Sequence, residues 1–168
     1  VLRRGNLERP GKVASPGALG MIEALPSRFE LEDASNEGSR RAALARWISD
    51  PQNPLTWRSI VNRIWYYHFG RGLVETLNDF GHMGARPSHP ELLDWLAMRF
   101  RDRGGSIKDL HWLIVTSAVY RQTSAEREDA SHIDASNRLL WRAQRHRLSA
   151  ECVGDAMLRA SGKLDAKM

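Results

Sequence analysis

From Ser39 onward, apolar side chains recur at intervals of three and four residues, which is the spacing that one face of an α-helix requires. Polar N-cap residues, prolines and glycines divide this pattern into segments. Strands would instead place apolar residues at every second position, and no stretch of useful length alternates in that way. The periodicity therefore predicts a mainly α fold, a compact bundle of about six helices.

The first 36 residues lack this helical spacing. Glycines and prolines fall too close together between Gly5 and Pro26 for a helix of ordinary length. We therefore divide the chain into an irregular N-terminal arm, 1–36, and a helical domain, 37–168. Apolar patches at Val13-Ala14 and 19–25 are expected to lay the arm over a neighbouring surface.

The expected helices share a polar residue before the first turn and a glycine, a proline or a polar loop after the last. They span 39–47, 54–69, 88–104, 106–121, 138–147 and 150 onward. Ser39 is expected to cap the first, and Ser88 with Glu91 to form a capping box at the third. The second, fourth and last helices are expected to begin at Asn53, Ser106 and Ser149, and Gly70 to end the second. The last helix is expected to place Ala150, Val153 and Met157 in the core. A long glycine-rich loop over 70–87 and a polar loop over 122–131 connect them. Long ordered loops often carry function.

The 54–69 helix carries the clearest apolar face. At 100° per residue, its core side is expected to hold Trp57, Ile60, Val61, Ile64, Tyr67 and His68. Asn62 and Arg63 leave that side, and two interpretations of them stay open. They form a hydrogen-bonded clamp on the glycine-rich loop, or Arg63 bonds a carboxylate in Glu75, in Asp79 or in a ligand.

Catalytic signatures are missing from the chain. Cys152 is the single cysteine, which excludes an internal disulfide, a cysteine-based zinc or iron–sulfur site and covalent attachment of a c-type haem. No serine lies in a Gly-x-Ser-x-Gly turn, and no glycine loop has the Lys-Ser/Thr ending that holds phosphates. We therefore expect no cofactor within these residues and assign no catalytic residue.

Six histidines remain as candidates for chemistry, and none has the spacing of a known metal motif. His68 and His111 fall on apolar helix faces, where a buried imidazole bonded to a carbonyl or a carboxylate is expected. His82 and Asp79 lie in the glycine-rich loop and His89 opens a helix. A metal site that joins them is the less favoured alternative.

The net charge of +5 comes from 25 basic and 20 acidic residues that are mostly interleaved. Only one segment is strongly one-signed, and it contains Arg138, Arg142, Arg145, His146 and Arg147. An arginine-rich helix over 138–147 would suit nucleic acid, but so mild an overall excess disfavours that partner. No apolar run approaches the roughly 18 residues needed to span a bilayer, so no transmembrane segment is expected.

Six tryptophans are many for 168 residues. By helical angle, Trp47 and Trp57 belong to the core, whereas Trp112 falls away from the apolar face that holds Leu110 and Ile114. An exposed Trp112 would mark a contact with another domain or with a sugar ring.

Short characteristic strings lie near both ends of the chain, at Gly5-Asn6, Pro10-Gly11 and Ser161-Gly162, and several longer ones lie between them. They are Asn53-Pro54-Leu55-Thr56, Val61-Asn62-Arg63-Ile64-Trp65, His68-Phe69-Gly70-Arg71-Gly72-Leu73-Val74, Asp79-Phe80-Gly81, Pro87-Ser88-His89-Pro90-Glu91-Leu92-Leu93-Asp94-Trp95-Leu96-Ala97, Tyr120-Arg121-Gln122 and Asn137-Arg138-Leu139-Leu140. Through these strings the chain resembles the planctomycete-type C-terminal domain of unknown function. It departs from that pattern at Trp57, Gly105 and Trp112, where the family commonly has a small residue, an aromatic and an arginine.

The resemblance implies a setting but no reaction. Such domains end large exported proteins that often carry a c-type cytochrome-like domain at the N-terminus. We therefore expect a part of a multidomain parent in the periplasm or cell envelope, with any c-type haem elsewhere in that parent. The residues kept in their family positions form the candidate functional cluster, which is Asn62, Arg63, His68, Asp79, His89 and Arg121.

Three functions are compatible with these observations. The first is an accessory or interaction module that packs on other domains of the parent protein. The second is part of an enzyme acting on a polysaccharide or another polymer, with its site between the 54–69 helix and the 70–90 loop. It requires the candidate cluster to line one accessible cleft. The third is nucleic-acid binding through the 138–147 helix, with an affinity that falls steeply with salt.

Overall fold

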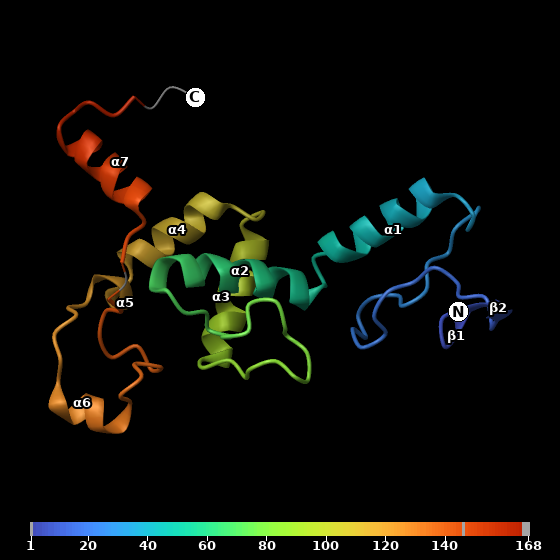
Figure 1. Ribbon diagram of the computed structural model, residues 1–168, viewed down its shortest axis with the longest axis horizontal. Coiled ribbons are helices and arrows are strands. Elements are labelled where there is room, and N and C mark those ends of the chain that lie inside the picture. Colours follow the sequence, from blue (N-terminus) through green and yellow to red (C-terminus); the bar gives the residue numbers. More distant parts are fainter. Residues whose placement is uncertain (1, 146, 166–168) are drawn as a thin grey trace.

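The computed structural model describes residues 2–145 and 147–165 and is mainly helical, which confirms the predicted fold class (Figure 1). In chain order, the elements of this part are β1 (Leu2–Arg3), β2 (Asn6–Pro10), α1 (Glu37–Ser49), α2 (Pro54–Phe69), α3 (Pro90–Asp102), α4 (Ile107–Thr116), α5 (Ala118–Arg121), α6 (Glu128–Ile133) and α7 (Ala150–Ala160). None of these helices has the length and apolar composition needed to cross a bilayer.

Helices α2, α3 and α4 pack against one another and form the compact bundle at the centre of Figure 1. The buried core of this bundle consists of Val61, Trp65, Phe69, Leu73, Val74, Leu93, Leu96, Phe100, Leu110 and Ile114. Leu73 and Val74 belong to the loop that connects α2 with α3. This loop is therefore held by the core, although it has no regular structure of its own.

The ends of α2 agree with the prediction. The Asn53 side chain accepts a hydrogen bond from the Leu55 N–H, and Pro54 occupies the first helical position, where its missing N–H costs nothing. Gly70 ends the helix with a φ of 72°, a left-handed conformation that glycine adopts without strain. Local signals alone therefore determined both ends of this helix.

The predicted face of α2 was only partly right. Val61 is buried as expected, but Tyr67 is exposed and Asn62 is completely buried. The cause is the loop after α2, which lies over the side of the helix that carries Asn62. Helical periodicity assigns that side to solvent, because it considers the residues of the helix alone. It does not take account of a loop that folds back over the helix from later in the chain.

Three predicted helix starts or ends were wrong. Asn36, not Ser39, caps α1 and accepts a hydrogen bond from the Ser39 N–H at 3.1 Å. The capping box at Ser88 does not form, because the Ser88 N–H and hydroxyl both bond the Leu73 carbonyl and His89 takes the N-cap position. Ser117 divides the predicted 106–121 helix into α4 and α5, since its extended backbone ends one and its side chain caps the other.

The arginine-rich 138–147 segment is not helical in its described part, and His146 lies outside the described residues. Asn137 and Leu140 have left-handed φ values of 54° and 58°, which interrupt any helix. The buried Asn137 side chain instead bonds the backbone of Arg142. A short helix, α6, occupies part of the loop predicted over 122–131.

The N-terminal arm from residue 2 onward and helix α7 lie away from the central bundle (Figure 1). Residues 2–36 are mostly irregular, and Ile22 and Leu25 of this arm pack on Trp47 of α1 in a second, small apolar cluster. At the other end, α7 begins after Ser149 as predicted, but no residue of it is buried. The expected core positions in α7, which include Val153 and Met157, are exposed.

Candidate functional site

The candidate cluster is divided among three places in the structure. Asn62, Arg63 and Asp79 hold the loop after α2. His68 lies where α2 meets α4, and Arg121 ends α5, one residue after a tyrosine whose ring contacts His68. His89 stands at the start of α3.

Asn62 is a clamp on the loop. Its Oδ1 accepts a hydrogen bond from the Val74 N–H, and its Nδ2 donates one to the Val74 carbonyl, each at 2.9 Å. A side chain at Gly72 would place its Cβ 2.9 Å from the Asn62 amide atoms, so the close approach requires glycine. All polar atoms of the Asn62 amide group are used inside the protein, which leaves Asn62 no role toward a ligand.

Arg63 does not bond the expected carboxylates. Its guanidinium donates to the side-chain oxygen of Asn78. Glu75 pairs instead with Arg71 at 3.4 Å, and Asp79 accepts a hydrogen bond from the Gly81 N–H within its own turn. Arg63 and Asp79 line one open groove together with Leu19 and Met21 of the arm, but the other four candidates do not.

His68 and His111 contact each other rather than a carbonyl or a carboxylate. The His68 Nε2 and the His111 Nδ1 are 2.6 Å apart, so one ring donates the hydrogen that the other accepts. The ring of Tyr120 packs edge-on to His68, with centroids 5.6 Å apart. His68 is half-buried and His111 is exposed, which corrects the predicted buried state. Burial lowers the pKa of His68, and His111 lowers it further.

Acidification is expected to weaken the fold through His68. Because the pKa of His68 is lower in the folded chain, the unfolded chain binds more protons. The contribution of His68 to stability is then complete above the unfolded pKa of about 6.5 and is lost as the pH falls from there toward the folded pKa. The urea midpoint of His68→Gln should fall less between about pH 7.5 and 5.5 than that of the parent chain.

The control for this experiment is His132→Gln, at an exposed histidine of α6. This variant should lose as much stability on acidification as the parent chain, because the exposed ring of His132 contacts no second histidine among the described residues. An unchanged pH dependence in His68→Gln would contradict the prediction.

His89 bonds the preceding Ser88 hydroxyl at 3.0 Å, close to where α3 meets the loop. Among the described residues, no three histidine, cysteine, aspartate or glutamate side chains are close enough together to hold a metal ion. The alternative of a metal bound by His82, Asp79 and a further histidine therefore has no geometry to support it here.

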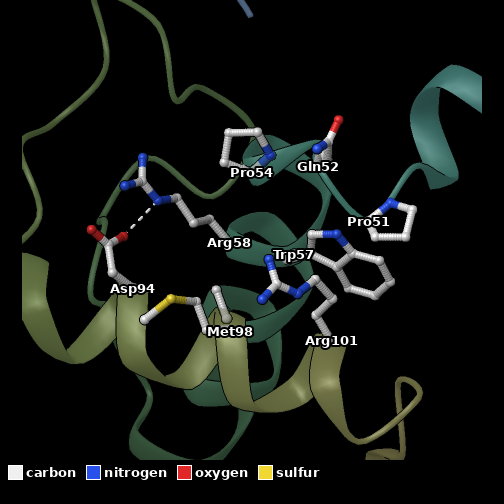
Figure 2. A pocket seen from close by; sticks show the side chains of 9 residues that line it. Pro51, Gln52, Pro54, Trp57, Arg58, Asp94, Met98 and Arg101 are labelled. Atoms are coloured by element: carbon white, nitrogen blue, oxygen red, sulfur yellow. Dashed lines mark hydrogen bonds and ion pairs between the residues drawn. The ribbon is translucent and has the colours of Figure 1, made fainter. Parts of the chain in front are cut away.

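A groove that the sequence analysis missed lies between α2 and α3 (Figure 2). It has a volume of about 340 Å³ and is lined mainly by Pro51, Gln52, Pro54, Trp57, Arg58, Asp94, Ala97, Met98 and Arg101. Arg58 Nε donates to Asp94 Oδ1 at 2.6 Å across the groove. One sequence signal could have pointed to this groove. Trp57 stands where the family commonly has a small residue, and it lies in the wall of the groove.

Large apolar side chains are exposed on several helices. Trp112 is 69% exposed, which confirms that it falls away from the core face of α4. Tyr67 of α2 is 78% exposed, and Val153, Met157 and Leu158 of α7 are exposed as well. Patches of this kind commonly mark surfaces that bind another protein or domain.

Comparison with known proteins gives one match. The model of a family described as PSD1, protein of unknown function (DUF1553), matches residues 40–168. The match contains α2 to α7 and most of α1, while the arm lies outside it. No curated protein and no solved structure matches the chain.

Proposed function

This chain belongs to the PSD1 family of proteins of unknown function (DUF1553), and we propose that it is an accessory or interaction module that packs on other domains of a larger protein. The observation that carries this proposal is the uncovered apolar face of α7. An 11-residue helix is marginal in water by itself and normally draws its stability from packing. We infer that α7 finds this packing against a partner domain.

The sequence resemblance supplies the proposed setting. We place the module in an exported protein of the periplasm or cell envelope, linked to a c-type cytochrome-like domain. The haem would belong to that other domain, because Cys152 alone cannot provide the two thioether links of a Cys-x-x-Cys-His segment. In this proposal the 168 residues contribute binding surface and no cofactor.

Hydrogen exchange tests the proposal directly. In the longer parent protein, the amides of α7 should exchange at least about tenfold more slowly than in the isolated chain, because a covering partner suppresses local opening. Met157→Asp in the parent should return α7 to the fast exchange of the isolated chain. Met83→Asp, at a methionine of the glycine-rich loop that is more exposed than Met157, is the control. Equal exchange of α7 in the parent and in the isolated chain would contradict the proposal.

The two other hypotheses lose the structural features that they required. The enzyme hypothesis needed the candidate cluster to line one cleft, and the groove that Arg63 and Asp79 line contains none of the other four candidates. The nucleic-acid hypothesis needed a helix over 138–147, where the described residues form an irregular segment. We therefore propose neither of them.

A further inference from the structure

Two arginines direct unused hydrogen-bond donors toward the groove between α2 and α3. The Nε of Arg58 donates a hydrogen bond to Asp94, and the Nε of Arg101 donates one to Asp102. For the terminal Nη groups of both, the described part of the chain provides no hydrogen-bond partner. Figure 2 shows the guanidinium of Arg101 beside Trp57, with Arg58 and Asp94 on the opposite side of the groove. A planar guanidinium with a free edge is suited to binding a carboxylate by two parallel hydrogen bonds.

The apolar wall of this groove is formed by Trp57, whose ring is held by contacts on two sides. The Trp57 Nε1 donates to the Asp50 carbonyl at 3.3 Å, and its ring packs edge-on against Phe100 with centroids 6.0 Å apart. Pro51 and Pro54 continue the surface beside it. A held indole surface of this kind is suited to packing against the apolar C–H face of a sugar ring.

The groove also contains hydrogen-bond acceptors. Asp94 Oδ1 is occupied by Arg58, but Oδ2 has no hydrogen-bond partner among the described residues, and the side chain is 43% exposed. The exposed Gln52 amide lies at the opposite edge and offers both a donor and an acceptor. A ligand that carries hydroxyl groups as well as an acid group would use these acceptors together with the arginines.

The composition of the walls favours a sugar over a peptide. The groove lies between two helices whose central N–H and C=O groups are bonded within each helix, so an extended peptide would find no backbone to pair with. The volume of about 340 Å³ is at the small end for ligand pockets. It is suited to one or two rings rather than to a long segment.

We propose that this groove binds an acidic sugar, a pyranose unit that carries a carboxylate. The carboxylate bonds the free guanidinium edge of Arg101, the ring packs on Trp57, and the hydroxyl groups bond Asp94 and Gln52. Arg58 orients Asp94 and neutralises its negative charge, so that the carboxylate does not repel the ligand. This inference does not depend on the interaction-module proposal, since α7 takes no part in the groove.

Isothermal titration calorimetry of the 168-residue chain at about physiological salt tests this site. Trigalacturonate should bind, and galactotriose, which lacks the carboxylates, should bind at least about tenfold more weakly. Arg101→Gln should weaken trigalacturonate binding by about tenfold or more, because it removes a charge-assisted pair of hydrogen bonds. The far-ultraviolet circular dichroism of each variant confirms that it is folded.

Arg99→Gln is the matched control, because Arg99 lies on the same helix but stacks over Trp95 at 5.6 Å and does not line the groove. Its affinity for trigalacturonate should stay within about twofold of the parent chain. If Arg99→Gln and Arg101→Gln lost affinity for trigalacturonate equally, the effect would be a general charge attraction, and the proposal would be overturned. Absence of trigalacturonate binding, equal binding of galactotriose, or equally tight binding of hexaglutamate would also overturn it.

Discussion

Asn62→Ala is expected to destabilise the chain by about 2–6 kcal/mol, because it leaves the N–H and the carbonyl of Val74 unpaired, each at about 1–3 kcal/mol. Both Asn62 and Val74 are buried, so water cannot replace the lost amide. A domain of this size has a total stability of only about 5–15 kcal/mol. The loop after α2 should also become more mobile near Val74, since these two hydrogen bonds join it to α2.

Urea unfolding followed by circular dichroism measures this effect, with Asn78→Ala as the control. Asn78 also accepts a hydrogen bond from α2, through Arg63, but it is exposed. Its loss should change the free energy of unfolding by no more than about 0.5 kcal/mol. Similar urea midpoints for Asn62→Ala and Asn78→Ala would show that the buried clamp contributes no more to stability than the exposed hydrogen bond.

Trp65→Ala is expected to cost about 3–5 kcal/mol, the usual range for removing a large aromatic side chain from a core. Trp65 is 4% exposed and stacks on Phe69 with ring centroids 4.2 Å apart. Its removal leaves a cavity between α2 and the rest of the central bundle that neighbouring side chains fill only in part. The melting temperature should fall accordingly, and a partly unfolded protein is the expected outcome at the upper end of this range.

Trp112→Ala is the matched control, because the same side chain is removed from a position that is 69% exposed. It should change the free energy of unfolding of the isolated chain by no more than about 0.5 kcal/mol. A loss as large as that of Trp65→Ala would contradict the division between core and surface tryptophans. A loss that appears only in the parent protein would place Trp112 in a contact with another domain.

The two proposals concern different parts of the chain, the uncovered apolar surface of α7 and the acidic-sugar groove. The surface of α7 lies at one end of the molecule, whereas the groove lies in the central bundle (Figure 1). A module can therefore be docked through α7 while its groove stays open. Variants at Met157 and at Arg101 should accordingly affect docking and sugar binding independently, because distant sites usually act additively.

Local signals were sufficient wherever a feature depends on a few neighbouring residues. The N-cap at Asn53, the stop at Gly70 and the caps at Ser106 and Ser149 were all predicted, because a cap is a hydrogen bond between residues two or three positions apart. The exposure of Trp112 followed from helical angle alone. The single cysteine likewise limited the chemistry of the chain without any structure.

The features that failed depend on contacts between distant parts of the chain. The Ser88 capping box is lost because Ser88 bonds Leu73. The arginine-rich segment is irregular where the Gln122 amide donates to the Leu140 carbonyl and the Ala143 N–H donates to the Thr123 carbonyl. His68 pairs with His111, which is 43 residues away, rather than with a carbonyl. In each case a tertiary hydrogen bond replaced the local one that the pattern indicated.

Sequence alone established the fold class, both ends of α2, the start of α7 and the membership in the family, because periodicity, caps and motifs depend on residues that are close together in the chain. Only the tertiary structure determined that Asn62 is a clamp, that α7 is uncovered, and that Trp57, Arg58, Asp94 and Arg101 share a groove. The reason is geometric. A groove or a clamp joins residues from two different elements. The number of residues between two elements in the sequence does not determine whether they pack against each other.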